Sequence, residues 1–294
     1  MAEIIQSATD LALESAQLWR EQNPGELPGV RSRELHCKGF PVTEVEVLNE
    51  EGERAVGKPA GHYRTLELGS RQGRSADYFP RLVEALAEEL RSLLALKEGE
   101  SVLVVGLGNR NVTPDAVGPW AVEQTVVTRH LVSARPEQFG QFRPVSAVAT
   151  GVLGTTGVES GELVRALCGQ LHPAAVVAVD ALAARSAQRL CTTIQLADTG
   201  IVPGSGVGNA RFALTEEALG TRVIAVGVPT VVRGAVLCAN LGGTQEEQEA
   251  LGELFVTPKD IDDTASELSR AIGWGLSLAL QEDLTLEDVR LLLS

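Results

Sequence analysis

The chain has 294 residues, of which 44% are hydrophobic, enough for a sizeable core in one large domain or two smaller ones. Its 25 basic and 39 acidic residues give a formal net charge of −14, which disfavours direct nucleic-acid binding. No apolar run approaches the roughly 20 residues that cross a bilayer, and the acidic N-terminus lacks the features of a secretion signal. The four cysteines have no CxxC spacing, which fits free thiols in a reducing compartment. We therefore expect a soluble, cytoplasmic protein.

The N-terminal third predicts both helix and strand. Residues 1 to about 24 have a helical pattern that Asn23-Pro24-Gly25 ends with a turn signal. Val42 to Val47 alternates apolar and polar residues, as a half-buried strand does, and Tyr63 to Leu68 does so less regularly. Pro80 suits the first turn of a following helix, on which leucines recur along one face: Leu82, Leu86, Leu90, Leu93 and Leu94.

The central third predicts alternating strands and helices. Its strands are continuous runs of Val, Ile and Ala, which indicate a mostly parallel sheet covered on both faces by helices, a three-layer α/β core. The predicted elements are a strand at Ser101 to Val105, helices at Val117 to Leu131 and Val158 to Leu171, a strand at Ala174 to Val179, a helix at Ala181 to Leu190, and a strand at Val223 to Val228.

The C-terminal part predicts helices outside that core. Gly242 to Leu251 is acidic and polar, which is typical of an exposed loop or a solvated helix. Thr257 and Pro258 have the residue types of an N-cap and a first helical position, and the amphipathic segment Ile261 to Leu280 follows them. A short helix at Leu286 to Leu293 closes the chain.

Two aspartates follow predicted strands and are the first candidates for chemistry. Asp115 comes after the strand and glycine turn of VVGLGNRNVTPDAVGP, and Asp180 ends the apolar run PAAVVAVD. Strand ends of a parallel sheet meet at one edge, so the two carboxylates can share a pocket there. Repulsion and desolvation then raise one pKa, which leaves one carboxylate as a base for water and the other as an acid for the leaving group. The alternative is that each aspartate caps the helix that follows it.

Other motifs are weaker. The turn from Gly106 to Asn111 begins like a dinucleotide fingerprint, but lacks the third glycine and the ribose-binding acid. Asp198 lies in an Asp-Thr-Gly tripeptide that is either a structural turn or a support for the site. Ser205 lies in a glycine-rich loop that lacks the spacing of a nucleophile elbow, and fits a flexible substrate-facing or oligomer-facing loop or a simple turn. His130 is predicted to end a helix, where its charge suits the dipole.

Seven ordered blocks between Ser101 and about Leu280 resemble one known family. The blocks are GLGNRNVTPDAVGP, VEQTVVTRHL, FRPVSAVATGVLGTTGVES, AVDALAARS, IQLADTGIVPGSGVGN, VIAVGVPTVV and VTPKDID. Together they resemble the germination protease of endospore-forming bacteria, the GPR endopeptidase. The core of that family is similar in turn to the hydrogenase maturation proteases.

The resemblance implies a peptidase of small acid-soluble spore proteins in the spore core, whose essential carboxylates correspond to Asp115 and Asp180. Supporting roles for Asn109, Asp198, His130 and Ser205 are further expectations. The resemblance also implies a homotetramer. It implies no cofactor, and neither nucleic-acid nor membrane binding is expected.

The family is made as zymogens that remove their own propeptide at a site resembling Thr-Glu-x-Ala-x-Glu. Here Thr9 to Glu14 reads Thr-Asp-Leu-Ala-Leu-Glu, so we predict self-cleavage between Asp10 and Leu11. The alternative is that Thr9 only caps the first helix. The predicted organisation is a propeptide at 1–10 and a single peptidase domain at 11–294, comprising a mixed region at 11–98, a catalytic core at 99–240 and C-terminal helices at 241–294.

Two other functions remain open at this point. A metal-dependent peptidase could use the same fold, because the hydrogenase maturation proteases act on nickel-containing partners, although no His-rich ligand set or HExxH spacing is present. The chain could also be an inactive relative that binds spore proteins without cutting them.

Overall fold

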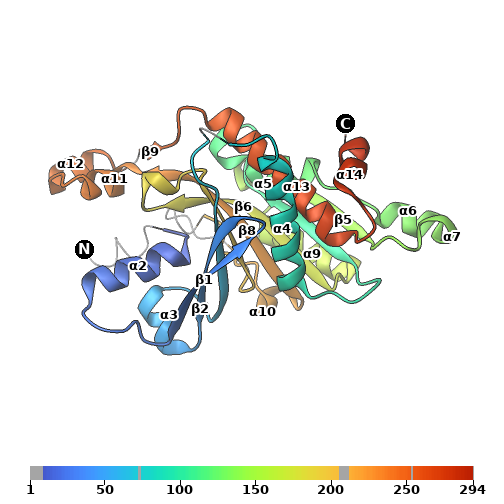
Figure 1. Cartoon of the computed structure of the whole chain (residues 1–294), viewed down its shortest axis with the longest axis horizontal. Coiled ribbons are helices and arrows are strands. Elements are labelled where there is room, and N and C mark those ends of the chain that lie inside the picture. The colour runs from blue at the N-terminus through green and yellow to red at the C-terminus, as the bar shows by residue number, and fades with distance from the viewer. Residues whose placement is uncertain (1–8, 72–73, 205–211, 253, 294) are drawn as a thin grey trace.

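The helices and strands of this chain are seen in a computed structural model that describes residues 9–71, 74–204, 212–252 and 254–293 (Figure 1). The strands are β1 (Val30–Cys37), β2 (Phe40–Val47), β3 (Gly61–Glu67), β4 (Val102–Leu107), β5 (Val145–Gly151), β6 (Ala175–Ala184), β7 (Thr193–Ala197), β8 (Arg222–Arg233) and β9 (Phe255–Val256). The longer helices are α2 (Ala12–Gln22), α4 (Tyr78–Leu94), α9 (Ser160–Leu171) and α13 (Ile261–Leu280). The shorter ones are α3 (Glu50–Val56), α5 (Val117–Glu123), α6 (Arg129–Ala134), α7 (Pro136–Phe139), α8 (Leu153–Thr156), α10 (Glu216–Leu219), α11 (Gly234–Asn240), α12 (Gln245–Ala250) and α14 (Leu286–Leu292), with 3₁₀ turns η1 (Thr113–Asp115) and η2 (Ala187–Arg189).

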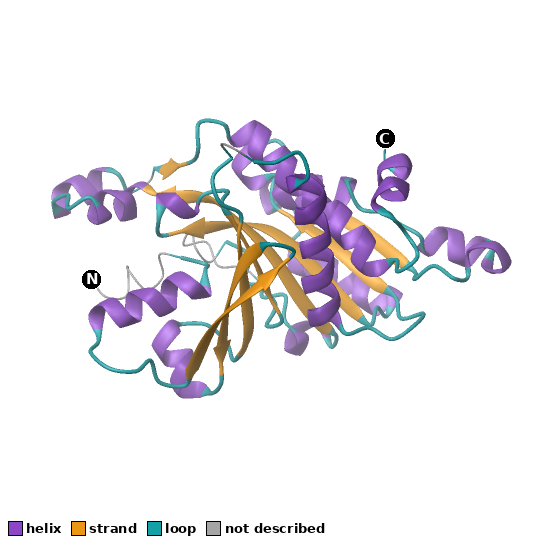
Figure 2. Cartoon of the chain, in the orientation of Figure 1, coloured by secondary structure: helices purple, strands orange, loops and turns teal. Residues whose placement is uncertain are grey.

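The strands form a twisted sheet in the order β1-β2-β3-β7-β8-β6-β4-β5, with β9 paired to β8 (Figure 2). Strands β5, β4, β6 and β8 pair in parallel. The pairs from β8 through β7, β3 and β2 to β1 are antiparallel. The predicted α/β class with a helix-covered sheet is confirmed, and the parallel strands form one half of it.

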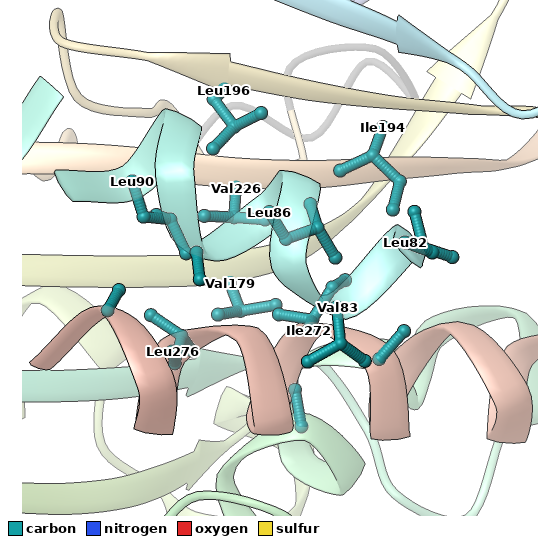
Figure 3. Close-up of a cluster of buried hydrophobic side chains, with 14 of the residues drawn as sticks. Leu82, Val83, Leu86, Leu90, Val179, Ile194, Leu196, Val226, Ile272 and Leu276 are labelled. Carbon is teal, nitrogen blue, oxygen red and sulfur yellow. The ribbon is translucent and has the colours of Figure 1, made fainter. Parts of the chain in front are cut away.

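The parallel half is buried on both faces, as its apolar runs predicted. Val102 and Val104 pack into a cluster with α4, α5 and α13, whereas Leu103 and Val105 pack on the other face with α9. This alternation follows from the two-residue period of a strand. Figure 3 shows α4 and α13 side by side over this face of the sheet, with Leu82, Leu86 and Leu90 of the predicted apolar face among the buried side chains of the strands.

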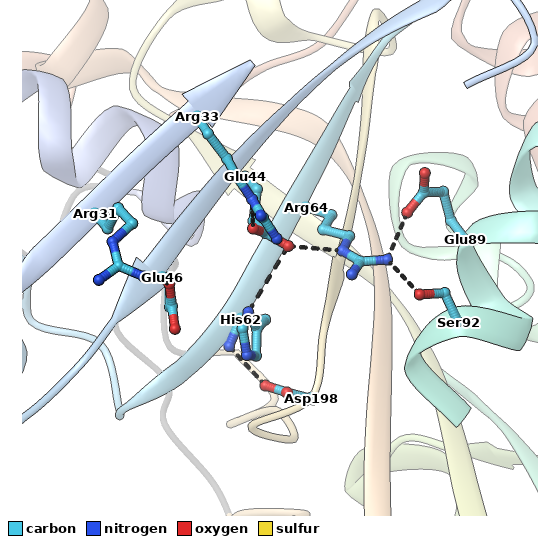
Figure 4. A network of polar contacts seen from close by, with 9 residues as sticks. All are labelled: Arg31, Arg33, Glu44, Glu46, His62, Arg64, Glu89, Ser92 and Asp198. Atoms are coloured by element: carbon cyan, nitrogen blue, oxygen red, sulfur yellow. Dashed lines mark hydrogen bonds and ion pairs between the residues drawn. The ribbon is translucent and has the colours of Figure 1, made fainter. Parts of the chain in front are cut away.

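The antiparallel half carries a charge network around a buried carboxylate (Figure 4), while Val45 and Val47 of β2 pack in an apolar cluster with α2 and α3. Glu44 is 1% exposed and forms ion pairs with Arg33 and Arg64. Arg64 also donates to Glu89 on α4, at 2.8 Å. Burial alone would raise the pKa of Glu44, but hydrogen bonds from the two arginines outweigh it and hold that pKa below its usual value. The network therefore fastens α4 to β2 and β3.

Two glycines let α5 touch the sheet directly. A Cβ on Gly118 would collide with the backbone carbonyls of Leu107 in β4 and Val179 in β6. A Cβ on Gly106 would collide with the carbonyl of Gly118. Glycine is needed at both positions because backbone meets backbone. This contact fixes the chain on either side of Asp115 against the strand that carries Asp180.

Two predicted helices are wrong in part. Residues 181–184, predicted to begin a helix, continue β6, because the longer β8 pairs with them as far as Val232. Sheet pairing here overrides the helix propensity of an alanine-rich run. The helix predicted at Val117 to Leu131 is α5 and α6 with a break between them, where the run of Thr and Val from residue 125 to 128 disfavours helix.

The remaining differences are elements that were not predicted and one helix that begins later than predicted. β1, α3, β5 and β7 were not predicted by periodicity. α13 begins at Ile261 with Asp260 as its N-cap, so Thr257 does not cap it and instead donates its Oγ1 to the Thr230 carbonyl, at 2.9 Å. The acidic stretch after Gly242 contains α12, which confirms the solvated-helix alternative. None of the helices in the described ranges has the length and apolar character of a bilayer span.

Replacing Gly118 with Ala will destabilise the fold by about 1–3 kcal/mol, the usual cost of forcing an extra group into a packed site. The matched control is Gly169→Ala on α9, where a Cβ would meet nothing within 4 Å, and which will be neutral or stabilising by about 0.4–1 kcal/mol. Urea unfolding of both variants measures the difference. Equal stabilities for the two variants would contradict the close helix contact.

Candidate active site

A cavity of about 340 Å³ opens where the four parallel strands approach their carboxyl ends. Its lining comes from the end of β4, the end of β5 and the second halves of β6 and β8. Ligands of open α/β sheets bind at this edge. Three carboxylate residues line this cavity together: Asp10, Asp115 and Asp180.

Asp180 is buried, with 5% of its surface exposed. It does not end its strand as predicted, because β6 runs on to Ala184 and pairs Asp180 with Gly227 of β8. Its Oδ1 accepts a hydrogen bond from the Ala181 N–H at 2.9 Å. Burial, and then the negative charges of Asp115 and Asp10, raise the pKa of Asp180 well above its usual value. Its position within a strand also excludes the predicted alternative of a helix cap.

Asp115 ends the 3₁₀ turn η1, beyond the β4 strand. Its Oδ2 accepts from the Asn109 N–H at 2.9 Å. Gly108 has a φ of +105°, and a Cβ there would collide with the Asp115 carbonyl, so the turn wraps closely around this aspartate. Thr230 of β8 fastens the turn by donating its Oγ1 to the Pro114 carbonyl at 2.6 Å. The N-cap of α5 is Ala116, with no side-chain capping bond, so Asp115 does not cap that helix.

The third carboxylate belongs to the chain's own N-terminal segment. The Asp10 N–H donates to the Ala183 carbonyl at 2.9 Å, and the Ala183 N–H donates back to Asp10 Oδ2 at 2.8 Å. The next residue, Leu11, is completely buried. The segment is therefore docked along the second half of β6, with Asp10 beside Asp180.

A hydrogen bond between Thr9 and Glu14 links the two ends of this segment. The Thr9 hydroxyl donates to Glu14 Oε2 and accepts from the Leu11 N–H at 3.0 Å. Glu14 is 3% exposed and also accepts from the N–H groups of Arg185 and Ser186, at 2.7 and 2.9 Å. The N-cap of α2 is Leu11, so Thr9 is not a helix N-cap. The first and last residues of the predicted recognition motif contact each other and the end of β6.

Two further polar residues hold the segment, and the sequence analysis missed both. Gln195 on β7 accepts from the Ala12 N–H at 2.8 Å, and its Nε2 donates to the Asp10 carbonyl at 3.3 Å. Lys58 donates to the Thr9 carbonyl at 3.2 Å. The available signal for Gln195 was a single polar residue within the apolar run Thr193-Ile194-Gln195-Leu196-Ala197.

The other candidates lie elsewhere or contact the site indirectly. Asn109 contacts Asp115 through its backbone only, and its Oδ1 accepts from the Asn111 N–H. Asp198 accepts from the His62 N–H at 2.7 Å (Figure 4) and does not line the cavity, as a structural turn would predict. His130 is exposed near the start of α6, not at the end of a helix. Ser205 lies outside the described residues.

No group of three or more His, Cys, Asp or Glu side chains is arranged to hold a metal ion within the described part of the chain. The three aspartates of the cavity are oxygen donors without a histidine or cysteine among them. That donor set does not match the nitrogen- and sulfur-rich sites of zinc or nickel.

The fold and the cavity define an α/β protein with paired carboxylates at its sheet edge and a peptide segment docked on them. Comparison with known proteins identifies the family to which the chain is similar. A family profile described as Germination protease matches residues 5–241. Proteins named germination protease are 39% identical in Clostridium tetani, over 96% of this chain and 97% of that protein, and 42% identical in Caldanaerobacter subterraneus, over 97% of each. The one from Bacillus velezensis is 35% identical over 95% of each chain.

The chain belongs to the germination protease family. The resemblance seen in the sequence is thus confirmed, and with it a peptidase of spore germination. The matched residues include the docked segment, Asp115 in η1, Asp180 in β6 and Gln195 in β7.

The raised pKa of Asp180 predicts how stability changes with pH. An unfolded aspartate has a pKa near ~3.9, so between that pH and the higher native pKa the folded state binds more protons than the unfolded one. This contribution to the free energy of unfolding is complete below about pH 4 and is lost as the pH rises through the native pKa. Asp180→Asn will remove it, so the variant will gain stability relative to wild type between pH 5 and pH 8.

Urea unfolding at pH 5 and pH 8 measures the stability of each variant relative to wild type. Intact mass spectrometry verifies that the protein used is uncleaved. The control is Asp263→Asn, because Asp263 is exposed on α13. If the difference between wild type and Asp180→Asn is the same at both pH values, the native carboxyl titrates normally.

Proposed function

We propose that this chain is a self-processing endopeptidase of small acid-soluble spore proteins in which Asp115 and Asp180 activate water. The observation that carries the proposal is the docked segment. The chain's own Thr-Asp-Leu-Ala-Leu-Glu is docked along the second half of β6, and its Asp10 lines the carboxylate cavity together with the two aspartates. The proposed propeptide is residues 1–10, and the mature chain begins at Leu11.

The environments of the two aspartates suggest their roles. Asp180 is buried and has a raised pKa, so it is the carboxylic acid that protonates the leaving amine. Asp115 is partly exposed and accepts the Asn109 N–H, so it is the carboxylate that takes a proton from water. Water attacks the Asp10 carbonyl carbon, the C–N bond to Leu11 breaks, and Leu11 leaves as an amine.

Substitution of either aspartate with Asn will slow removal of residues 1–10 by at least about 100-fold, the low end of what a general acid or base contributes. Intact mass spectrometry of the purified variants measures the removal, and the new N-terminus will be Leu11. Asp263→Asn serves as the control, because it removes the same charge from an exposed helix position. Processing of Asp115→Asn or Asp180→Asn at the wild-type rate would refute the two-aspartate mechanism.

The contacts of Thr9 and Glu14 support the substrate assignment. A Thr-Glu-Ile-Ala-Ser-Glu peptide has the same first and last residue types, and can form the same internal hydrogen bond while its last carboxylate accepts from Arg185 and Ser186. Before cleavage the chain's own segment fills these positions. A substrate peptide then cannot bind, and the zymogen is inactive toward it. After cleavage residues 11–14 must also leave them before a second peptide can bind.

Replacing the last Glu of this peptide with Ala will lower kcat/KM by at least about 100-fold, because each of its two hydrogen bonds, from Arg185 and Ser186, contributes about 1.5–3 kcal/mol. Replacing its Ser with Ala is the control. Fragment masses report cleavage of each peptide by the processed protein. Equal kcat/KM for the Glu and Ala peptides would show that the Glu14 contacts do not represent substrate binding.

The same assay separates the alternatives. Loss of cleavage on thorough chelation, with recovery on adding a metal, would favour a metal-dependent peptidase. Binding of the intact peptide without fragments would favour an inactive spore-protein-binding relative.

A further inference from the structure

Gln195 lies across the sheet from Asp180 in a single row of paired residues. Asp180 of β6 pairs with Gly227 of β8, and Gly227 pairs with Gln195 of β7. Paired residues project from the same face of a sheet, so Asp180 and Gln195 flank a residue without a side chain. Two strand spacings place them about 10 Å apart. This distance accommodates a peptide backbone with one group on each side of it.

The docked segment lies between these two residues. Asp10 and Leu182 line the carboxylate cavity and also a second cavity of about 210 Å³ that contains Gln195. The Asp10 carbonyl oxygen accepts from Gln195 Nε2, at 3.3 Å, while the Asp10 residue also borders the carboxylate cavity. The Asp10 carbonyl therefore has a hydrogen-bond donor in Gln195, which lies across β8 from Asp180.

Gln195 also contacts the docked segment on the C-terminal side of the Asp10–Leu11 peptide bond. Its Oε1 accepts from the Ala12 N–H at 2.8 Å, so one amide side chain binds on both sides of the Asp10–Leu11 peptide bond. Gln195 is only 7% exposed and lies on a central strand. Its position is fixed before any reaction, as transition-state stabilisation requires.

We propose that Gln195 is a catalytic residue that stabilises the oxyanion formed when water attacks the scissile carbonyl, and this rests on the proposed function. As the new C–O bond forms, the C=O π electrons move to the carbonyl oxygen, and the Gln195 Nε2–H donates to the negative charge there. When the C–N bond breaks, the carbonyl re-forms and the leaving nitrogen takes its proton from the carboxylic acid. The Oε1 contact holds the peptide in register for this step.

Two substitutions test the roles of the hydrogen-bond donor and the acceptor of the Gln195 side chain separately. Gln195→Met keeps the size of the side chain and removes both hydrogen bonds, whereas Gln195→Glu keeps an acceptor for the Ala12-type N–H and replaces the donor with a charged oxygen. With the Thr-Glu-Ile-Ala-Ser-Glu peptide, both variants will lose about 10²- to 10³-fold in kcat, the usual loss for one oxyanion donor. Only Gln195→Met will also raise KM, because it alone removes the acceptor for the substrate N–H that corresponds to that of Ala12. Gln138→Met is the matched control, because Gln138 is exposed on α7.

A pH profile provides a readout that a structural role would not affect. At low pH the introduced carboxyl of Gln195→Glu is protonated and can donate, so the kcat of this variant relative to wild type will rise as the pH falls. A kcat within threefold of wild type for Gln195→Glu at neutral pH, in a variant that melts like wild type, would overturn the oxyanion role. If wild-type protein cuts neither the peptide nor its own N-terminus, the proposed function fails, and this inference fails with it.

Discussion

The buried carboxyl group of Asp180 is the group on which the arrangement of this site depends. A carboxylate removed from water costs several kcal/mol unless it is paired or neutralised. Here the nearest charges are two more aspartates rather than an arginine or lysine, and these charges act with burial to raise the Asp180 pKa. Another buried acid, Glu44, is paired with two arginines. The absence of such a cation beside Asp180, among the residues that the structure describes, fits the chemical role proposed for it, whereas Glu44 has a structural role.

The backbone around Asp180 is built to keep this group in place. β6 and β8 stay paired past Asp180, which prevents the strand from ending in solvent at that point. Gly118 and Gly106 let α5 approach the strands without intervening side chains, and Gly108 lets the turn fold over Asp115. These contacts are between backbone atoms, so they leave little room for the two aspartates to separate. Rigid support of this kind is what a pair of reacting groups needs.

The docked N-terminal segment explains how a short motif can be recognised with few side chains. Most of its contacts are made by backbone groups, at Ala183, Arg185 and Ser186. Thr9 and Glu14 form a hydrogen bond with each other within the segment. The folded shape of the motif is therefore part of what the surrounding residues contact. In the proposed function, a substrate from another protein would have to adopt that shape in the same groove.

Periodicity alone predicted much of the parallel half, because its strands are apolar on both faces and its helices carry a clear leucine stripe. It failed where pairing competes with propensity, as in the alanine-rich end of β6, and where strands are short or half polar, as in β1 and β7. Asp115 and Asp180 were found because each follows an apolar run. Gln195 and Lys58 were not, because a single polar residue in a sequence does not show what it faces.

The sequence by itself determined the α/β class, the two carboxylates, the docked motif and, through seven ordered blocks, the family. These features are local, since each depends on residues close together in the chain or on a recognisable order of segments. The tertiary structure decided that Asp180 lies within its strand, that residues 9–14 dock along β6 with Asp10 in the lining of the carboxylate cavity, and that Gln195 lies across β8 from Asp180. Those facts depend on the order β7-β8-β6 across the sheet and on the register of its pairs, which bring together residues that are far apart in the chain.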